Sequence, residues 1–199
     1  MRRIAVALMV ALTFLATTFV SGPAQDATPT APNPALCTLE PVTIERLEAV
    51  GATPAADTDR YTESLEGTPV ALPTGNPVDA ETQQQIEDSM LINIACVNTG
   101  DPLLQLAVYS DNGMKRLLGS TESISDEEIA SLQTPTPLDE RAWTLIYDVS
   151  EAIELEGGKA GILIVGDDPV QDDSPSPTLF ILIEQDGHWY IDSFERTED

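Results

Sequence analysis

Hydrophobic and polar positions divide the chain into a helical first part and an extended second part. Between Asp79 and Asn98, apolar residues recur at the spacing of one helix face. The apolar positions are Ile86, Met90, Ile94 and Val97, widened by Leu91 and Ala95. Asp79 is a suitable N-cap and Gly100 follows the end of the pattern. The pattern predicts a long amphipathic helix with one buried face.

Shorter helices are predicted around it. The segments are Thr43 to Val50, Asp101 to about Val108, Met114 to Leu118 and Ser125 to about Leu132. Asp101-Pro102 is a cap residue followed by proline at the first helical position. Ser125 and Glu128 have the spacing of a capping box. Asn112-Gly113 predicts a break between two of these helices.

From Arg141 onward the pattern is typical of β-strands. The predicted strands are Arg141 to Leu155, Lys159 to Val165, Thr178 to Glu184 and His188 to Glu195. Gly157-Gly158 and Asp186-Gly187 are two-residue hairpin turns. Helices followed by an antiparallel meander of about four or more strands define an α+β domain. The middle strands are apolar on both faces, so we expect helices on one face and the N-terminal segment or a partner subunit on the other.

The first 24 residues resemble a secretory signal. Arg2 and Arg3 precede the uncharged, mostly apolar segment 4–20, and the small residues 21–24 suit a cleavage site after Ala24. We therefore expect a secreted or extracytoplasmic protein. An uncleaved membrane anchor is the alternative, because the apolar run approaches the length of a membrane span.

The rest of the chain divides by composition. Residues 25–36 form a Pro/Thr/Ala-rich stretch, which predicts a flexible spacer. Residues 37–77 are expected to form an N-terminal extension with a short helix and an irregular loop. Residues 78–199 form the predicted α+β domain.

Cys37 and Cys96 are the two cysteines of the chain. In an exported protein such a pair usually forms a disulfide, worth on the order of 4 kcal/mol for a loop of this length. Two buried free thiols are the alternative. No C-x-x-C redox motif is present.

The chain is very acidic, with a formal net charge of −25. Such a charge disfavours binding to nucleic acids or anionic membrane surfaces. The acidic loop 167–173 lacks EF-hand spacing, so we expect a solvated loop and no metal. No P-loop, G-x-S-x-G or H-E-x-x-H motif is present, and no cofactor is expected.

The order of elements resembles the nuclear transport factor 2-like superfamily, also called SnoaL-like or cystatin-like cone domains. The resemblance rests on the helix pair around Ile92 to Leu103, the helix end Leu106 to Asp111 and the final hairpin Asp186 to Asp192. It covers about residues 78–196. It implies a cone-shaped pocket between helices and a curved sheet, in which enzymatic members use an Asp or His base and Tyr or Trp donors.

Five side chains are candidates for such a site. Asp148 and His188 are the candidate catalytic groups, because a carboxylate on an apolar strand or the single histidine of the chain could act as a base. Tyr109, Tyr147 and Trp189 are the candidate ligand-binding residues. The alternatives are an outward-pointing Asp148, a surface His188 and a Trp189 that fills the core.

No complete catalytic set is recognisable. The leading hypothesis is therefore an exported, non-catalytic module that binds a small apolar ligand or a protein partner. A small isomerase, cyclase or dehydratase with an Asp base in the cone is the alternative. A homodimer formed through sheet faces is a further alternative.

Overall fold

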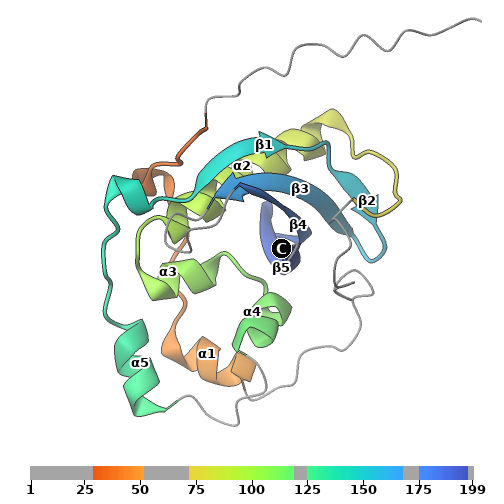
Figure 1. Ribbon diagram of the computed structural model, residues 1–199. Helices are drawn as coiled ribbons and strands as arrows, with labels where there is room; N and C mark the ends of the chain where they lie inside the picture. The colour runs from red at the N-terminus through yellow and green to blue at the C-terminus, as the bar shows by residue number, and fades with distance from the viewer. Residues whose placement is uncertain (1–28, 52–71, 119–124, 168–174, 197–199) are drawn as a thin grey trace, which may run out of the picture.

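The computed structural model describes residues 29–51, 72–118, 125–167 and 175–196 (Figure 1). The helices are α1 (Ile44–Gly51), α2 (Ala80–Val97), α3 (Pro102–Ala107), α4 (Asp111–Leu118) and α5 (Asp126–Leu132), with 3-10 turns η1 (Pro34–Leu36) and η2 (Glu140–Ala142). The strands are β1 (Leu145–Val149), β2 (Ile153–Leu155), β3 (Lys159–Asp167), β4 (Ser176–Gln185) and β5 (His188–Arg196). The predicted α+β class is confirmed. The predicted signal segment lies outside the described residues.

All five strands form one antiparallel sheet in the order β1-β3-β4-β5, with β2 also paired to β3. The sheet curves, and α2 lies along one of its faces (Figure 1). The main core lies between them and includes Ile86 and Met90 of α2 and Ile162 of β3. On the opposite face of β4, Leu179 and Ile181 are also buried.

Local sequence signals place several helix ends where they were predicted. The Asp79 side chain accepts hydrogen bonds from the backbone N–H groups of Glu81 and Thr82 at the start of α2. Ser125 and Glu128 form the predicted capping box of α5. These contacts involve neighbouring residues, which is why the sequence alone indicates them.

The extended run predicted from Arg141 to Leu155 is two strands. β1 and β2 both pair with β3 and are separated by residues 150–152. In that gap the Ser150 N–H donates to the Leu163 carbonyl, and the Ala152 N–H donates to the Gln83 side chain. These bonds to β3 and α2 hold residues 150–152 between the two strands, so the predicted single strand is interrupted there.

The break predicted at Asn112-Gly113 is also wrong, because both residues lie in the first turn of α4. The helix begins beside β5, where the Ser110 N–H donates to the Ile191 carbonyl. The first turn is closed by the Met114 N–H, which donates to the Ser110 carbonyl.

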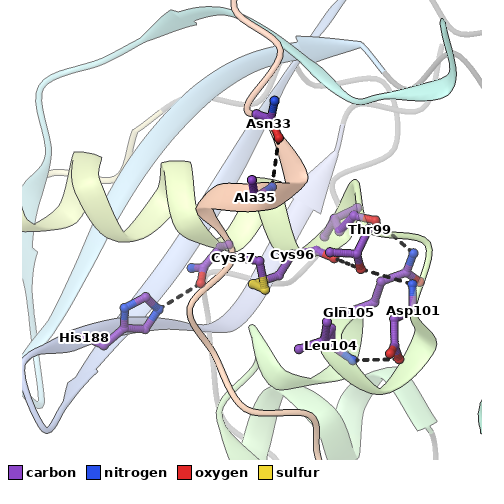
Figure 2. The surroundings of a disulfide bond; sticks show 11 residues. Asn33, Ala35, Cys37, Cys96, Thr99, Asp101, Leu104, Gln105 and His188 are labelled. Carbon is purple, nitrogen blue, oxygen red and sulfur yellow. Dashed lines mark hydrogen bonds between the residues drawn. A yellow bond between two sulfur atoms is a disulfide. The ribbon is translucent and has the colours of Figure 1, made fainter. Parts of the chain in front are cut away.

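The N-terminal segment is held against the domain at several points. Thr30, expected in a flexible spacer, forms an antiparallel bridge with Ile146, and each backbone N–H donates to the other's carbonyl at 2.8 Å. The buried Asn98 amide donates to the Pro32 carbonyl. Cys37 is joined by a disulfide to Cys96 in α2, with 4.7 Å between the Cα atoms (Figure 2).

Beyond the disulfide, the extension helps build a second, smaller core. Its buried members are Val42, Leu47, Val50, Leu106, Ala107 and Met114, contributed by the N-terminal segment with α1, α3 and α4. Arg46 of α1 also donates to Asp111 of α4 at 2.8 Å. Within the part of the chain described, no helix has the length and apolar character needed to cross a membrane.

Candidate functional site

A cavity of about 190 Å³ lies between α2 and the inner face of the sheet. Its lining residues are Met90, Asn93, Ile94, Val97, Tyr109, Thr144, Leu145, Ile146, Ile164, Gly166, Asp167, Thr178, Phe180, Ile191 and Phe194. Most of these side chains are apolar. The cavity is therefore suited to apolar groups, with a few polar atoms placed around it.

Strand register brings the sheet residues of this lining together. Ile164 on β3 pairs with Thr178 on β4, and Phe180 on β4 pairs with Phe194 on β5. The β4–β5 register shifts after Ile181, and this leaves Asp192 as an extra residue of β5. The shift lets Ile191 and Phe194, three positions apart, line the same cavity.

Asn93 is the most deeply buried polar side chain of the lining, and its amide is already used. Its Nδ2 donates to the Trp189 carbonyl at 3.0 Å, and its Oδ1 lies 2.9 Å from His188 Nε2. These bonds attach the middle of α2 to the start of β5. The main role of Asn93 is therefore to hold α2 against β5, and its amide is not free to bind a ligand.

Tyr109 is the predicted site residue that the structure places at the cavity. It precedes α4, and the backbone on both sides of it is bonded to β5: the Ile191 N–H donates to the Val108 carbonyl, and the Ser110 N–H donates to the Ile191 carbonyl. Burial raises the pKa of the Tyr109 phenol, so the group stays protonated at neutral pH. Its hydroxyl makes no hydrogen bond to any residue in the described ranges.

A cluster around Asp192 holds this region in place. The carboxylate accepts from Ser110 Oγ at 2.6 Å, from Lys159 Nζ at 2.8 Å and from Asn112 Nδ2 at 3.2 Å. Burial by itself would raise the pKa of Asp192, but the bonds from Lys159 and Ser110 and the charge of Lys159 outweigh it and lower the pKa. The carboxylate is thus ionised, paired and structural.

A second cavity, of about 280 Å³, lies beside α4 and β5. It is lined by Tyr109, Gly113, Arg116, Leu117, Ser193 and Phe194. Two aromatic residues, Tyr109 and Phe194, line both cavities, and their ring centroids are 6.5 Å apart.

The other predicted ligand-binding residues are not among those that line either cavity. Trp189 is buried in the main core at 7% exposure, as its core-filling alternative stated. Tyr147 is half-buried on β1. Which way such residues point depends on strand register, which the sequence pattern did not resolve.

The two predicted catalytic candidates also lie outside the cavity lining. Asp148 is exposed beside a bulge in β1, and its carboxylate accepts from the backbone N–H of Val149. His188 packs edge-on against Tyr190 and is among the residues surrounding the disulfide (Figure 2). Burial lowers the pKa of His188, so its imidazole is neutral at pH 7. The structure does not bring Asp148 and His188 together at one site.

Sequence reasoning missed several lining residues, including Thr144, Asp167, Thr178 and Phe194. Thr178 and Phe180 share the strand alternation of the buried Leu182, so that signal could have identified them. Phe194 could not be found in this way, because the register shift interrupts the alternation along β5.

The protein is an α+β domain in which a long helix lies over a curved antiparallel sheet, with an apolar cavity between them. No group of three or more potential metal ligands is found among the described residues. No protein-family model, curated protein or solved structure matches the chain.

Proposed function

We propose that this protein is a nuclear transport factor 2-like, non-catalytic module that binds a small apolar ligand in the cavity between α2 and the sheet. The observation that carries the proposal is the cavity itself, which is lined largely by apolar side chains from α2, β3, β4 and β5. A concave surface lined by apolar side chains is a favourable place for an apolar molecule.

The size of the cavity limits the ligand. An apolar protein cavity of about 150 Å³ is large enough to bind benzene. The 190 Å³ found here therefore suits a single ring or a short alkyl group. Larger ligands require more space than this cavity alone provides.

Tyr109 supplies an orienting hydrogen bond in this proposal. Because its pKa is raised, the phenol keeps its proton and can donate a hydrogen bond to an acceptor on the ligand. A neutral hydrogen-bond donor such as this phenol can fix the orientation of the ligand, and no charged group has to lose its water for it to do so.

The two candidate catalytic residues, Asp148 and His188, are not among the residues that line the cavity, and this favours binding over catalysis. Asp148 is exposed, and His188 is hydrogen-bonded to Asn93. A general base must come within hydrogen-bond reach of the reacting proton, and neither residue lines the cavity.

The protein is proposed to act outside the cytoplasm. The Cys37–Cys96 disulfide is consistent with an oxidising compartment. Secretion itself rests on the predicted signal segment.

The test is a titration of the exported, oxidised protein with toluene, followed by amide chemical shifts in ¹H–¹⁵N NMR spectra. We expect saturable shifts at lining residues such as Ile94, Ile164 and Phe180. Ile94→Phe should abolish them, because the larger side chain fills the cavity. Ile92→Phe, on the same helix but not among the lining residues, is the matched control and should bind normally.

Two results would overturn the proposal. One is a wild-type protein whose lining amides do not respond to toluene. The other is an Ile94→Phe variant that binds toluene as well as Ile92→Phe does.

A small isomerase, cyclase or dehydratase is the second candidate, and Asp167 is the observation that favours it. Its half-buried side chain lines the same cavity as Tyr109, which gives the cavity both a carboxylate and a phenolic donor. In an enzyme of this kind, Asp167→Asn would abolish turnover while leaving toluene binding intact. A turnover that survived Asp167→Asn unchanged would contradict this candidate.

A further inference from the structure

Three aromatic side chains follow one another along the wall of the first cavity. Tyr109, Phe180 and Phe194 all line it. The ring centroids of Tyr109 and Phe194 are 6.5 Å apart, and those of Phe180 and Phe194 are 6.3 Å apart. Phe180 and Phe194 pair across β4 and β5, so their side chains project from the same face of the sheet. Tyr109 is held beside β5 by its bridge to Ile191. These three rings form an aromatic row.

The spacing of the aromatic row suits a positively charged group. The face of an aromatic ring attracts a cation that lies within about 6 Å of the ring centroid. Because neighbouring centroids are 6.3 and 6.5 Å apart, one cationic group can lie within that distance of two rings at once. Phe194 is 44% exposed, so the aromatic row reaches the solvent from which a ligand arrives.

The charges around the cavity also favour a cation. Among the described residues that line it, Asp167 is the only one with a charged side chain. The chain as a whole has a net charge of −25, which attracts cations and repels anions. Arg116 lines the second cavity, beside α4, and is not among the residues that line the first.

We propose that the aromatic row binds a quaternary ammonium group. This inference rests on the proposed function, because it names the class of ligand that the same cavity takes. The methyl groups of a trimethylammonium ion suit the apolar lining, and its charge is attracted by the ring faces. A primary ammonium group would instead lose its hydrogen bonds to water, and most of this lining offers no acceptor in exchange.

The size of the cavity agrees with this class of ligand. A trimethylammonium group is close in size to a benzene ring, which an apolar cavity of about 150 Å³ can hold. The 190 Å³ of the first cavity therefore accommodates such a group with a short substituent.

The test compares three probes that share a branched, apolar end: choline, 3,3-dimethyl-1-butanol and 3,3-dimethylbutanoate. Choline and the alcohol have the same shape and differ by one positive charge. Each probe is titrated into the exported, oxidised protein, and the dissociation constant is taken from the amide chemical shifts of Ile94 and Ile164. We expect choline to bind about 2- to 30-fold more tightly than the alcohol, the range of a cation–π contribution. Excess toluene should displace choline, since both occupy the first cavity.

Phe194→Leu isolates the contribution of one ring. Phe194 is partly exposed, and leucine keeps an apolar side chain at the position. This variant should weaken choline binding about 2- to 5-fold and change the binding of the alcohol much less. Tyr147→Leu is the matched control, because it removes an aromatic ring from β1 that is not among the lining residues. It should bind choline as the wild type does.

The outcomes separate this inference from the proposed function. If neither toluene nor the alcohol shifts the lining amides, the proposed function fails. If these neutral probes bind but choline binds no more tightly than the alcohol, the quaternary ammonium inference alone is overturned. It is also overturned if 3,3-dimethylbutanoate binds more tightly than choline, or if Phe194→Leu and Tyr147→Leu weaken choline binding equally.

Discussion

At the scale of single residues, Asp192 shows how one buried charge organises the region around the candidate site. Its carboxylate joins β5 to Lys159 on β3 and to Ser110 at the start of α4. The side chain of Asp192 is 3% exposed and that of Lys159 is 19% exposed. A carboxylate in such surroundings depends on its cationic partner, since burial alone disfavours the ionised form.

Lys159→Met should lower the free energy of unfolding by about 3 kcal/mol at pH 7, because it leaves the buried Asp192 carboxylate without its cation. Urea denaturation followed by tryptophan fluorescence measures this change. Lys115→Met, which changes a lysine of α4, is the matched control and should have a small effect.

The same variant has a predicted pH dependence. In the folded wild-type protein the pKa of Asp192 is lowered, so its contribution to stability is present above about pH 4 and is lost as the pH falls through the folded pKa. The stability difference between wild type and Lys159→Met should therefore shrink between pH 7 and pH 3. A difference that stayed constant over this range would contradict the assignment.

At the scale of elements, the contact of α4 with β5 leaves no room for a side chain at Gly113. A Cβ atom at this position would collide with the Ile191 carbonyl oxygen. Gly113, which predicted a break from the sequence, thus lies inside a helix. Close packing of that helix against β5 explains why the position has no side chain.

Gly113→Ala should destabilise the protein by about 1–3 kcal/mol, although the same change in an open helix normally stabilises it. Gly51→Ala at the end of α1 is the control, because a Cβ there meets nothing within 4 Å. We expect that control to be neutral or slightly stabilising. Thermal denaturation of both variants gives the comparison, and equal effects would contradict the packing argument.

The disulfide joins the N-terminal segment to α2, so removing it should loosen that attachment. Replacing both Cys37 and Cys96 with alanine should lower the free energy of unfolding by about 2–4 kcal/mol. Urea denaturation measures the loss, and a reducing agent should destabilise only the wild type. An unchanged urea midpoint in the double variant would show that other contacts suffice.

The sequence predicted elements well where short-range contacts define them. The caps at Asp79 and Ser125 are examples, since each bonds to residues two or three positions away. The predictions were wrong where contacts with residues distant in the sequence determine the structure, as at Gly113 and between β1 and β2. Of the candidate site, Tyr109 was predicted, whereas Phe194 depends on a shift in strand register that no local pattern reveals.

At the scale of the whole molecule, negative charge dominates. The chain has 34 acidic and 9 basic residues besides its single histidine. Such an excess produces self-repulsion in the compact state, and dissolved salt screens it.

Raising NaCl from 10 mM to 500 mM should therefore increase the melting temperature by about 3–6 °C. Differential scanning calorimetry measures the shift. KCl at equal ionic strength should act equally if screening is the cause. A melting temperature that fell with added salt would indicate that attractive ion pairs dominate instead.

Four consecutive residues of β5 each serve a different neighbour. Ile191 lines the first cavity, Asp192 bonds to Lys159, Ser193 lines the second cavity, and Phe194 lines both. Adding or deleting one residue inside this tetrapeptide would move every one of these side chains to the wrong neighbour at once. During evolution the tetrapeptide should accordingly accept substitutions more readily than changes in length, while the nearby Asp186-Gly187 turn should tolerate insertions.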